Sequence, residues 1–361
     1  MSTVKGKKHS SRISNRGPLY ALAAAALFGA STPFAKILLQ RMPPALLAGL
    51  LYLGSGVGLT LCVWFRRRFK DKTTGEARLK SADLPWLAGA ILCGGVIGPL
   101  LLLIGLRITP ASSSSLLLNL EGVLTALIAW FIFKENFDRR IALGMLAIIA
   151  GGALLSWSGR PRLGVPWGSL AIAGACLAWA IDNNLTRNVS VGDPLQIAAV
   201  KGFAAGAVNL IIALIIGASI PNFSTIGTAA LVGFLSYGVS LALFVLSLRK
   251  IGTARTGAYF SIAPFVGALL SILILKDVVT IYFFGAAALM LVGVWLHLTE
   301  RHEHAHWHEA FEHDHRHSHD EHHQHHDDPA LLAETHSHLH RHERLHHAHP
   351  HYPDIHHRHE H

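Results

Sequence analysis

The residues with the clearest capacity for chemistry are histidines, and they are concentrated at one end of the chain. Of the 26 histidines among the 361 residues, 24 lie between Thr299 and His361. The imidazole side chain has a pKa near neutrality and is the commonest protein ligand for nickel, cobalt, copper and zinc. The sequence therefore predicts a C-terminal tail that binds divalent transition metal ions, with no further cofactor required.

The candidate ligands in the tail alternate with other residues or occur as adjacent pairs. Several imidazoles on one short stretch could converge on an ion without a preformed pocket. Because this stretch has few apolar residues, we expect it to be disordered until metal binds. The candidate metal ligands are His302, His304, His306, His308, His313, His315, His317, His319, His322, His323, His325, His326, His336, His338, His340 and His342.

Two other interpretations of the tail stay open. It carries five arginines against thirteen acidic residues, a net charge of −8 with neutral histidines. Mild acidification would make it strongly positive, so the tail could instead sense pH. It could also be a low-complexity extension without a function. An expression tag is a poor match, because tags are short and uniform.

A second group of candidates consists of ionisable side chains inside apolar stretches. Such groups are costly at bilayer depth, so they indicate a functional site. Glu121 lies near the middle of the apolar stretch 111–133, with Asn119 close by. We expect it to bind a substrate, a cation or a proton. The alternative is a protonated glutamic acid that is hydrogen-bonded to a neighbouring helix.

A polar patch in the stretch 167–188 contains Asp182 and Asn183, and Lys201 lies in the next stretch. At about 1.5 Å per residue, Asp182 and Lys201 would both lie near 9 Å from the same membrane face, so they could pair. The pair would either hold two helices together or take part in gating and coupling.

Two further basic residues, Lys36 and Arg187, lie close to the ends of apolar stretches. Long basic side chains at such positions usually extend to the membrane interface. Direct contact with a substrate is the alternative.

These residues must be positioned by membrane-spanning helices. The apolar blocks are long enough to cross about 30 Å of hydrocarbon. They predict an all-α polytopic membrane protein, embedded in a lipid bilayer. The ten predicted spans are 18–39, 44–65, 84–106, 111–133, 140–157, 167–188, 195–217, 226–248, 256–275 and 279–298.

The basic residues of the loops predict the orientation. With the N-terminus in the cytoplasm, nineteen Lys and Arg face the cytoplasm and five face the outside. An even number of spans then places the histidine tail in the cytoplasm as well. The basic charge of the spanning part fits orientation and anionic lipid rather than nucleic acid. We expect a bacterial-type inner membrane, and a homodimer is compatible with the sequence.

The chain also repeats itself. Each predicted unit holds five spans, and an odd number forces the second copy to enter the membrane inverted. Inverted repeats are typical of secondary transporters, with the substrate site near the midplane between the halves. The correspondences are Phe28, Lys36 and Pro43 with Trp179, Arg187 and Pro194 at an offset of 151, and Leu106-Arg107, Ala126-Leu127 and Lys134-Glu135 with Leu248-Arg249, Ala268-Leu269 and Lys276-Asp277 at an offset of 142.

With these features the chain resembles the EamA family of the drug/metabolite transporter superfamily. The run from Asn119 to Trp130, closing at Lys134-Glu135, is similar to the family's Glu-Pro-Val run that closes in Gly-Glu. Gly122 replaces the proline here, whereas the second copy keeps Pro264 and has Ala263 in the place of the glutamate. The resemblance covers residues 18–298 and implies export of amino acids, nucleosides, drugs or other metabolites.

Together these features predict four parts: a basic cytoplasmic N-terminus (1–17), a first five-helix repeat (18–157), a second (167–298) and the histidine-rich tail (299–361). No hydrolytic or phosphate-binding motif occurs, so we expect no enzyme and no ATP coupling.

We expect proton-coupled export of a divalent transition metal, with nickel or cobalt ahead of zinc. The alternative is export of an amino acid or another small metabolite, with a tail that only buffers or senses metal. A metal-histidine complex as cargo lies between the two. A storage or sensor protein with an inert anchor would need neither ten spans nor a repeat.

Overall fold

In the computed structural model, residues 16–69, 84–133, 139–157, 166–187, 194–251 and 253–298 of the membrane part are described, together with 303–308, 312–317, 336–341 and 345–350 of the tail. These divide into two compact units, Met1–Thr299 and Glu300–His361.

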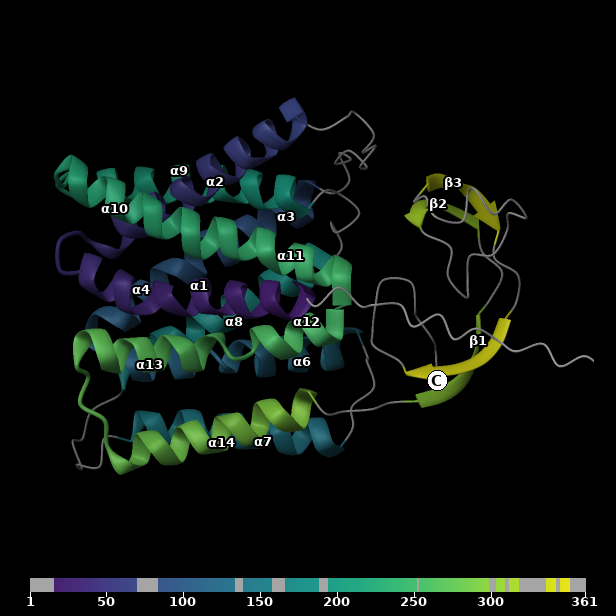
Figure 1. Cartoon of the computed structure of the whole chain (residues 1–361). Coiled ribbons are helices and arrows are strands. Elements are labelled where there is room, and N and C mark those ends of the chain that lie inside the picture. Colours follow the sequence, from purple (N-terminus) through teal and green to yellow (C-terminus); the bar gives the residue numbers. More distant parts are fainter. Residues whose placement is uncertain are drawn as a thin grey trace, which may run out of the picture. The chain divides into compact units, whose positions relative to one another are not determined.

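Helices make up the first unit (Figure 1). In chain order they are α1 (Arg16–Leu38), α2 (Pro44–Phe69), α3 (Leu84–Ala90), the π-helix η2 (Ile91–Ile97), α4 (Gly98–Ile108), α5 (Ala111–Leu117), α6 (Leu120–Phe133), α7 (Arg139–Ser156), α8 (Trp167–Arg187), α9 (Pro194–Ile215), α10 (Phe223–Gly233), the π-helix η3 (Phe234–Val239), α11 (Ser240–Ile251), α12 (Thr253–Phe260), α13 (Ala263–Leu275) and α14 (Ile281–Leu298).

Each of the ten predicted spans coincides with one of these helices or with a run of consecutive ones, and the predicted all-α membrane fold is confirmed. Among the described residues, seven stretches are long and apolar enough to cross a membrane on that basis alone. They are Arg16–Leu38, Pro44–Trp64, Leu84–Ile108, Ala111–Ile132, Arg139–Ser156, Leu195–Ile215 and Phe223–Ser247.

Four of the predicted spans are not regular α-helices. The stretch 84–108 contains η2 and the stretch 223–251 contains η3. Each of the stretches 111–133 and 253–275 is divided into two helices. The irregular segments of one half recur in the other at an offset of 142 or 143, which is the spacing of the sequence repeat. Discontinuous helices at equivalent positions are typical of the binding sites of repeat transporters.

The two divided helices are interrupted by different residues. Between α5 and α6, the backbone N–H of Asn119 donates to the Leu116 carbonyl and that of Glu121 to the Leu118 carbonyl, both at 3.1 Å, so a tighter i to i−3 turn replaces the α-helix. Between α12 and α13, Pro264 has no N–H to donate, and the helix restarts there. The Ser115 hydroxyl donates to the Pro264 carbonyl at 2.8 Å, so the two interruptions contact each other.

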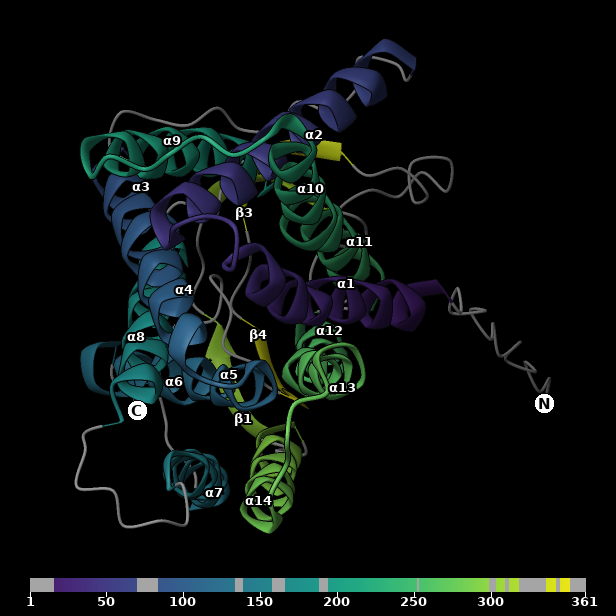
Figure 2. The same cartoon turned by 90° about the vertical axis from the view of Figure 1, so that its left-hand side faces the viewer.

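Small residues allow the helices to approach closely, as is usual where lipid gives no hydrophobic drive for helix association. A Cβ on Gly56 of α2 would lie 2.9 Å from the backbone nitrogen of Phe203 in α9. A Cβ on Gly29 of α1 would lie 2.9 Å from the backbone nitrogen of Gly267 in α13. Figure 2 looks along α7, α13 and α14 and shows α7 and α14 side by side, as Figure 1 does from the side.

The tail unit contains four strands: β1 (Glu303–His308), β2 (Glu312–His317), β3 (His336–Arg341) and β4 (Leu345–Pro350). β1 pairs with β4 and β2 with β3, both antiparallel. The rest of the tail, to which the predicted disorder also applies, lies outside the described residues. In the strand segments His alternates with another residue, and a period of two favours an extended strand. The pattern is therefore compatible with strand pairing as well as with metal binding.

Candidate functional site

The predicted carboxylate Glu121 lies in the first turn of α6, directly after the interruption. Its Oε1 accepts a hydrogen bond of 2.9 Å from the Asn183 side-chain amide of α8, which also contacts the Thr125 hydroxyl at 3.4 Å. The structure therefore brings together two of the predicted site residues, although the sequence did not predict that they bond to each other. Thr125, one turn after Glu121, joins them.

Asn119 does not share this cluster. Its side-chain amide donates to the Leu116 carbonyl at 2.9 Å and contacts the Met290 sulfur at 3.9 Å. The residue is 8% exposed. Its amide is thus a second donor to the carbonyl that already accepts the Asn119 backbone N–H, and it stabilises the turn between α5 and α6.

Asp182 and Lys201 form the predicted pair. The Lys201 Nζ lies 2.5 Å from one Asp182 carboxylate oxygen and 2.8 Å from the other, and the Thr186 hydroxyl donates to the same carboxylate at 2.8 Å. The two side chains are 18% and 11% exposed, so the pair is largely removed from solvent. The predicted contact is confirmed, and its role in transport stays a prediction.

The π-helix η2 positions this pair. Gly94 lies so close to Asp182 that a Cβ at this position would overlap the carboxylate. The Gly94 carbonyl accepts hydrogen bonds from the Tyr52 hydroxyl at 2.8 Å and from the Trp179 indole at 3.0 Å. A π-helix shifts its backbone bonds from i+4 to i+5, and such segments are frequent at functional sites. Side chains of α2 and α8 therefore meet at one carbonyl of η2.

Aromatic rings extend the site toward the second repeat. Tyr237 of η3 lies 5.7 Å from Tyr52 and 5.8 Å from Phe28 between ring centroids, and Phe28 lies 5.6 Å from Phe260 of α12. We name Glu121, Asn183, Asp182, Tyr52, Trp179 and Tyr237 the central site.

Lys36 lies elsewhere, at the end of α1. Its ammonium group donates to three carbonyls at the end of α4, those of Leu106 at 2.5 Å, Thr109 at 2.9 Å and Arg107 at 3.1 Å. A cation satisfies the free carbonyls of a helix C-terminus. The Lys36 side chain, which was predicted to extend to the membrane interface, thus caps the C-terminus of α4. For Arg187 the structure gives the position, the last residue of α8, and not the side chain.

Nine of the predicted histidine ligands lie on the tail strands, and six of them are paired with one another in the strand register. In the β2–β3 pair the directly opposed residues include His313 with His340, His315 with His338 and His317 with His336. Alternate residues of a strand share a face, so these three pairs are at register positions on one face. His302, His319, His322, His323, His325, His326 and His342 lie outside the described residues.

Two groups of residues were not predicted from the sequence. One is the aromatic part of the central site, although Phe28 and Trp179 were matched by the repeat offset. The other is β4, where His347 and His349 lie opposite His306 and His304. Within the part of the chain that the structure describes, no group of three or more His, Cys, Asp or Glu side chains is arranged to hold a metal ion.

Two inverted halves, interrupted helices at equivalent positions and polar groups between them define the class of protein: a multi-pass membrane transporter. The chain belongs to the EamA-like transporter family, whose description matches residues 15–157 and 166–299. The resemblance seen in the sequence is thereby confirmed, and the family is one of transporters rather than enzymes.

Relatives agree with this assignment. An uncharacterized transporter of Methanothermobacter thermautotrophicus is 30% identical over 292 residues, 78% of this chain and 85% of that protein. The uncharacterized inner membrane transporter YedA of Escherichia coli K12 is 26% identical over 264 residues, 70% of this chain and 81% of that protein.

Two further comparisons are partial or concern the fold alone. A protein of Pseudomonas paraeruginosa, described as a probable 4-amino-4-deoxy-L-arabinose-phosphoundecaprenol flippase subunit, ArnE, is 44% identical over 79 residues, 22% of this chain and 65% of that protein. A solved crystal structure has a TM-score of 0.58 at 19% identity, and the match covers 78% of this chain and 95% of that chain.

Proposed function

We propose that the chain is a secondary exporter of a small organic solute that carries an amine, coupled to protons through Glu121. The observation that carries the proposal is the central site, in which Tyr52 and Trp179 meet at the Gly94 carbonyl beside Asp182, and Glu121 binds the neighbouring Asn183. A carboxylate pairs with an ammonium group, and the face of a Trp or Tyr ring attracts the same cation. The central site therefore combines two groups that recognise an organic cation.

The Asp182–Lys201 pair supports the same class of solute. The Lys201 ammonium occupies one carboxylate of the central site, which shows that an alkylammonium group fits there. A substrate amine would then bind Glu121, whose partner Asn183 is neutral. The partial relative ArnE, whose match covers 22% of this chain, is named after a solute with an amino sugar, 4-amino-4-deoxy-L-arabinose.

Export of a divalent transition metal, nickel or cobalt ahead of zinc, is the second candidate. The three opposed histidine pairs of β2 and β3 favour it, because directly opposed Cβ atoms lie about 4.5–5.5 Å apart and two imidazoles at that spacing could share one ion. In this case the tail would collect metal and the membrane part would deliver it outward.

Cell-associated solute separates the two candidates. Cells that express the full chain are loaded with organic amines, with neutral amino acids or with nickel, cobalt and zinc, and the retained amounts are measured. We expect cells with the wild-type chain to retain less of at least one amine than cells with the inactive control Glu121→Gln. Retention of nickel, cobalt and zinc should be the same in both. Metal loss that depends on Glu121, without amine loss, would replace the first candidate by the second.

A further inference from the structure

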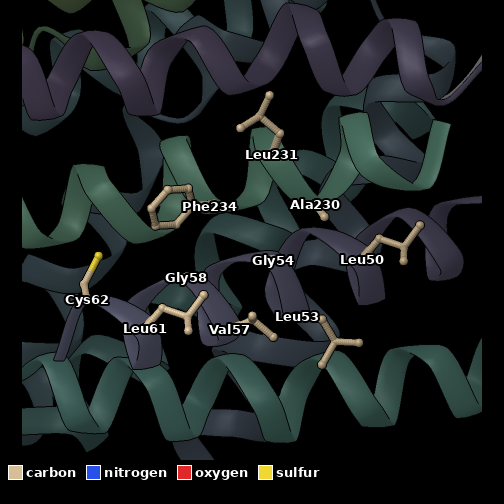
Figure 3. Close-up of a pocket in the computed structure, with 10 residues that line it drawn as sticks. All are labelled: Leu50, Leu53, Gly54, Val57, Gly58, Leu61, Cys62, Ala230, Leu231 and Phe234. Atoms are coloured by element: carbon tan, nitrogen blue, oxygen red, sulfur yellow. The ribbon is translucent and has the colours of Figure 1, made fainter. Parts of the chain in front are cut away.

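An apolar groove lies between α2 and α10, apart from the central site (Figure 3). Its volume is about 530 Å³, within the roughly 300–1,000 Å³ of ligand pockets. The lining consists of apolar residues, glycines and one cysteine: Leu50, Leu53, Gly54, Val57, Gly58, Leu61, Cys62, Ala230, Leu231 and Phe234. A solute with a charged or polar group would find no partner there, so the groove suits a hydrocarbon chain.

Two glycines of α2 form the floor of the groove, where α2 meets α10 and η3. A Cβ on Gly54 would overlap the backbone of Ala230, and one on Gly58 would overlap the Phe234 ring. The two helices therefore touch along the glycine face of α2, and the larger side chains rise on either side of the contact. Val57 is 47% and Leu231 is 55% exposed, so the groove is open to the surrounding lipid.

The length of the groove fits an acyl chain. From Leu50 to Cys62 it follows twelve residues of α2, about 18 Å at 1.5 Å per residue. One leaflet contributes about half of the roughly 30 Å of hydrocarbon. A chain that enters at the Cys62 end would thus span its own leaflet without leaving the groove.

The residues after Cys62 indicate the headgroup. Arg66, Arg67 and Arg68 occupy the end of α2, one helical turn beyond the groove, and Lys70 and Lys72 follow in the sequence. A cluster of four or more basic residues directly beside a membrane helix attracts anionic lipid. The positive-inside count places this end of α2 on the cytoplasmic side, where anionic lipids are enriched.

We propose that this groove binds one anionic phospholipid, with an acyl chain between α2 and α10 and its phosphate at the Arg66–Arg68 end of α2. The site is independent of the transported solute. It would hold α2 and α10, which belong to different halves of the molecule, against each other.

Lipid retention tests the proposal. The full-length protein is delipidated in detergent, titrated with phosphatidylglycerol or phosphatidylcholine, and examined by native mass spectrometry. We expect one tightly held phosphatidylglycerol and at least tenfold weaker binding of it to Val57→Trp, which fills the groove. Val292→Trp is the matched control, because Val292 is 50% exposed on α14 and does not line the groove. Equal binding by both variants would overturn the site.

The headgroup is tested separately. In the triple variant Arg66→Gln, Arg67→Gln and Arg68→Gln, we expect the preference for phosphatidylglycerol over phosphatidylcholine to disappear. An unchanged preference would overturn the assigned headgroup position. A wild-type dimer that Val57→Trp dissociates, without any loss of lipid, would show that a second copy occupies the groove.

Labelling of Cys62 gives a result that needs no variant. We expect phosphatidylglycerol to slow the reaction of Cys62 with a membrane-permeant maleimide at least tenfold. Cys93, which lies in η2 outside the groove, serves as the internal control and should react at an unchanged rate. Absence of protection at Cys62 would contradict the proposal even if Val57→Trp failed to fold.

Discussion

At the scale of single residues, the proposed function depends on two carboxylates with different partners. Glu121 accepts one hydrogen bond from a neutral amide, whereas Asp182 is held by Lys201 and Thr186. A carboxylate that already pairs with a cation binds an incoming cation less strongly than a carboxylate without a charged partner. We therefore propose that Glu121 binds the solute and the proton, and that Asp182 positions α8 against α9.

The Asp182–Lys201 pair can be tested by removing one charge and then both. Asp182→Asn leaves Lys201 without its partner in a largely buried position, and we expect a loss of about 3 kcal/mol in unfolding free energy. The double variant Asp182→Asn with Lys201→Met should recover most of this loss, as measured by thermal unfolding in detergent. If the double variant is stable but does not transport, the pair also serves gating or coupling.

The pairing of Asp182 with Lys201 could be predicted because the depth of each residue in its span follows from the sequence. The aromatic part of the central site could not. Tyr52 and Tyr237 lie 185 positions apart in the chain, and only the folded helices bring their rings to 5.7 Å. The match of Phe28 with Trp179 in the repeat was the available signal, and it indicated equivalence rather than a site.

At the scale of elements, irregular helices carry the central site. η2 supplies the carbonyl that Tyr52 and Trp179 share, and η3 supplies Tyr237. Pro264 marks one of the interrupted helices in the sequence. No comparable pattern marks the π-helices, because a shift from i+4 to i+5 bonding is decided by the packing of neighbouring helices.

Gly94→Ala tests the role of η2. The added methyl group would overlap the Asp182 carboxylate, so either η2 or α8 must move. We expect a loss of about 1–3 kcal/mol in unfolding free energy, together with reduced transport. Gly227→Ala is the control, since nothing lies within 4 Å of a Cβ at that position. Equal melting temperatures for the two variants would show that close approach at Gly94 is not required.

Lys36→Met tests the cap at the end of α4. The change leaves three carbonyls without their donor but keeps a side chain of similar length. We expect a loss of about 1 kcal/mol in unfolding free energy and an unchanged apparent affinity for the transported solute. A weaker affinity with unchanged stability would return Lys36 to the list of substrate ligands.

At the scale of the whole molecule, two five-helix halves surround the central site, and the histidine-rich tail lies outside the family match. The family assignment covers residues 15–157 and 166–299. The number of spans could be predicted because it is a pattern of hydrophobicity, and the repeat because matching residues recur at offsets of 151 and 142. The strand pairing of the tail could not, because a two-stranded ladder depends on pairing between segments that are distant in the sequence.

Deletion of residues 299–361 separates the two units. We expect the shortened protein to keep its amine transport and to lose the binding of nickel or cobalt, measured by calorimetry on the purified protein. The control replaces His313, His315 and His317 of β2 by Ala in the full chain, which should weaken metal binding and leave transport intact. Loss of transport in either variant would assign the tail to the transport cycle.

The central claim is that an amine-bearing solute crosses the membrane past Glu121 in exchange for protons. The most direct test is flux in proteoliposomes that contain the purified full chain and a pH-sensitive dye, with wild type and Glu121→Gln measured side by side. We predict that an outward amine gradient moves protons in the opposite direction for wild type, and at least tenfold more slowly for Glu121→Gln. Equal proton movement in the two proteins, or movement driven by nickel or cobalt alone, would contradict the account.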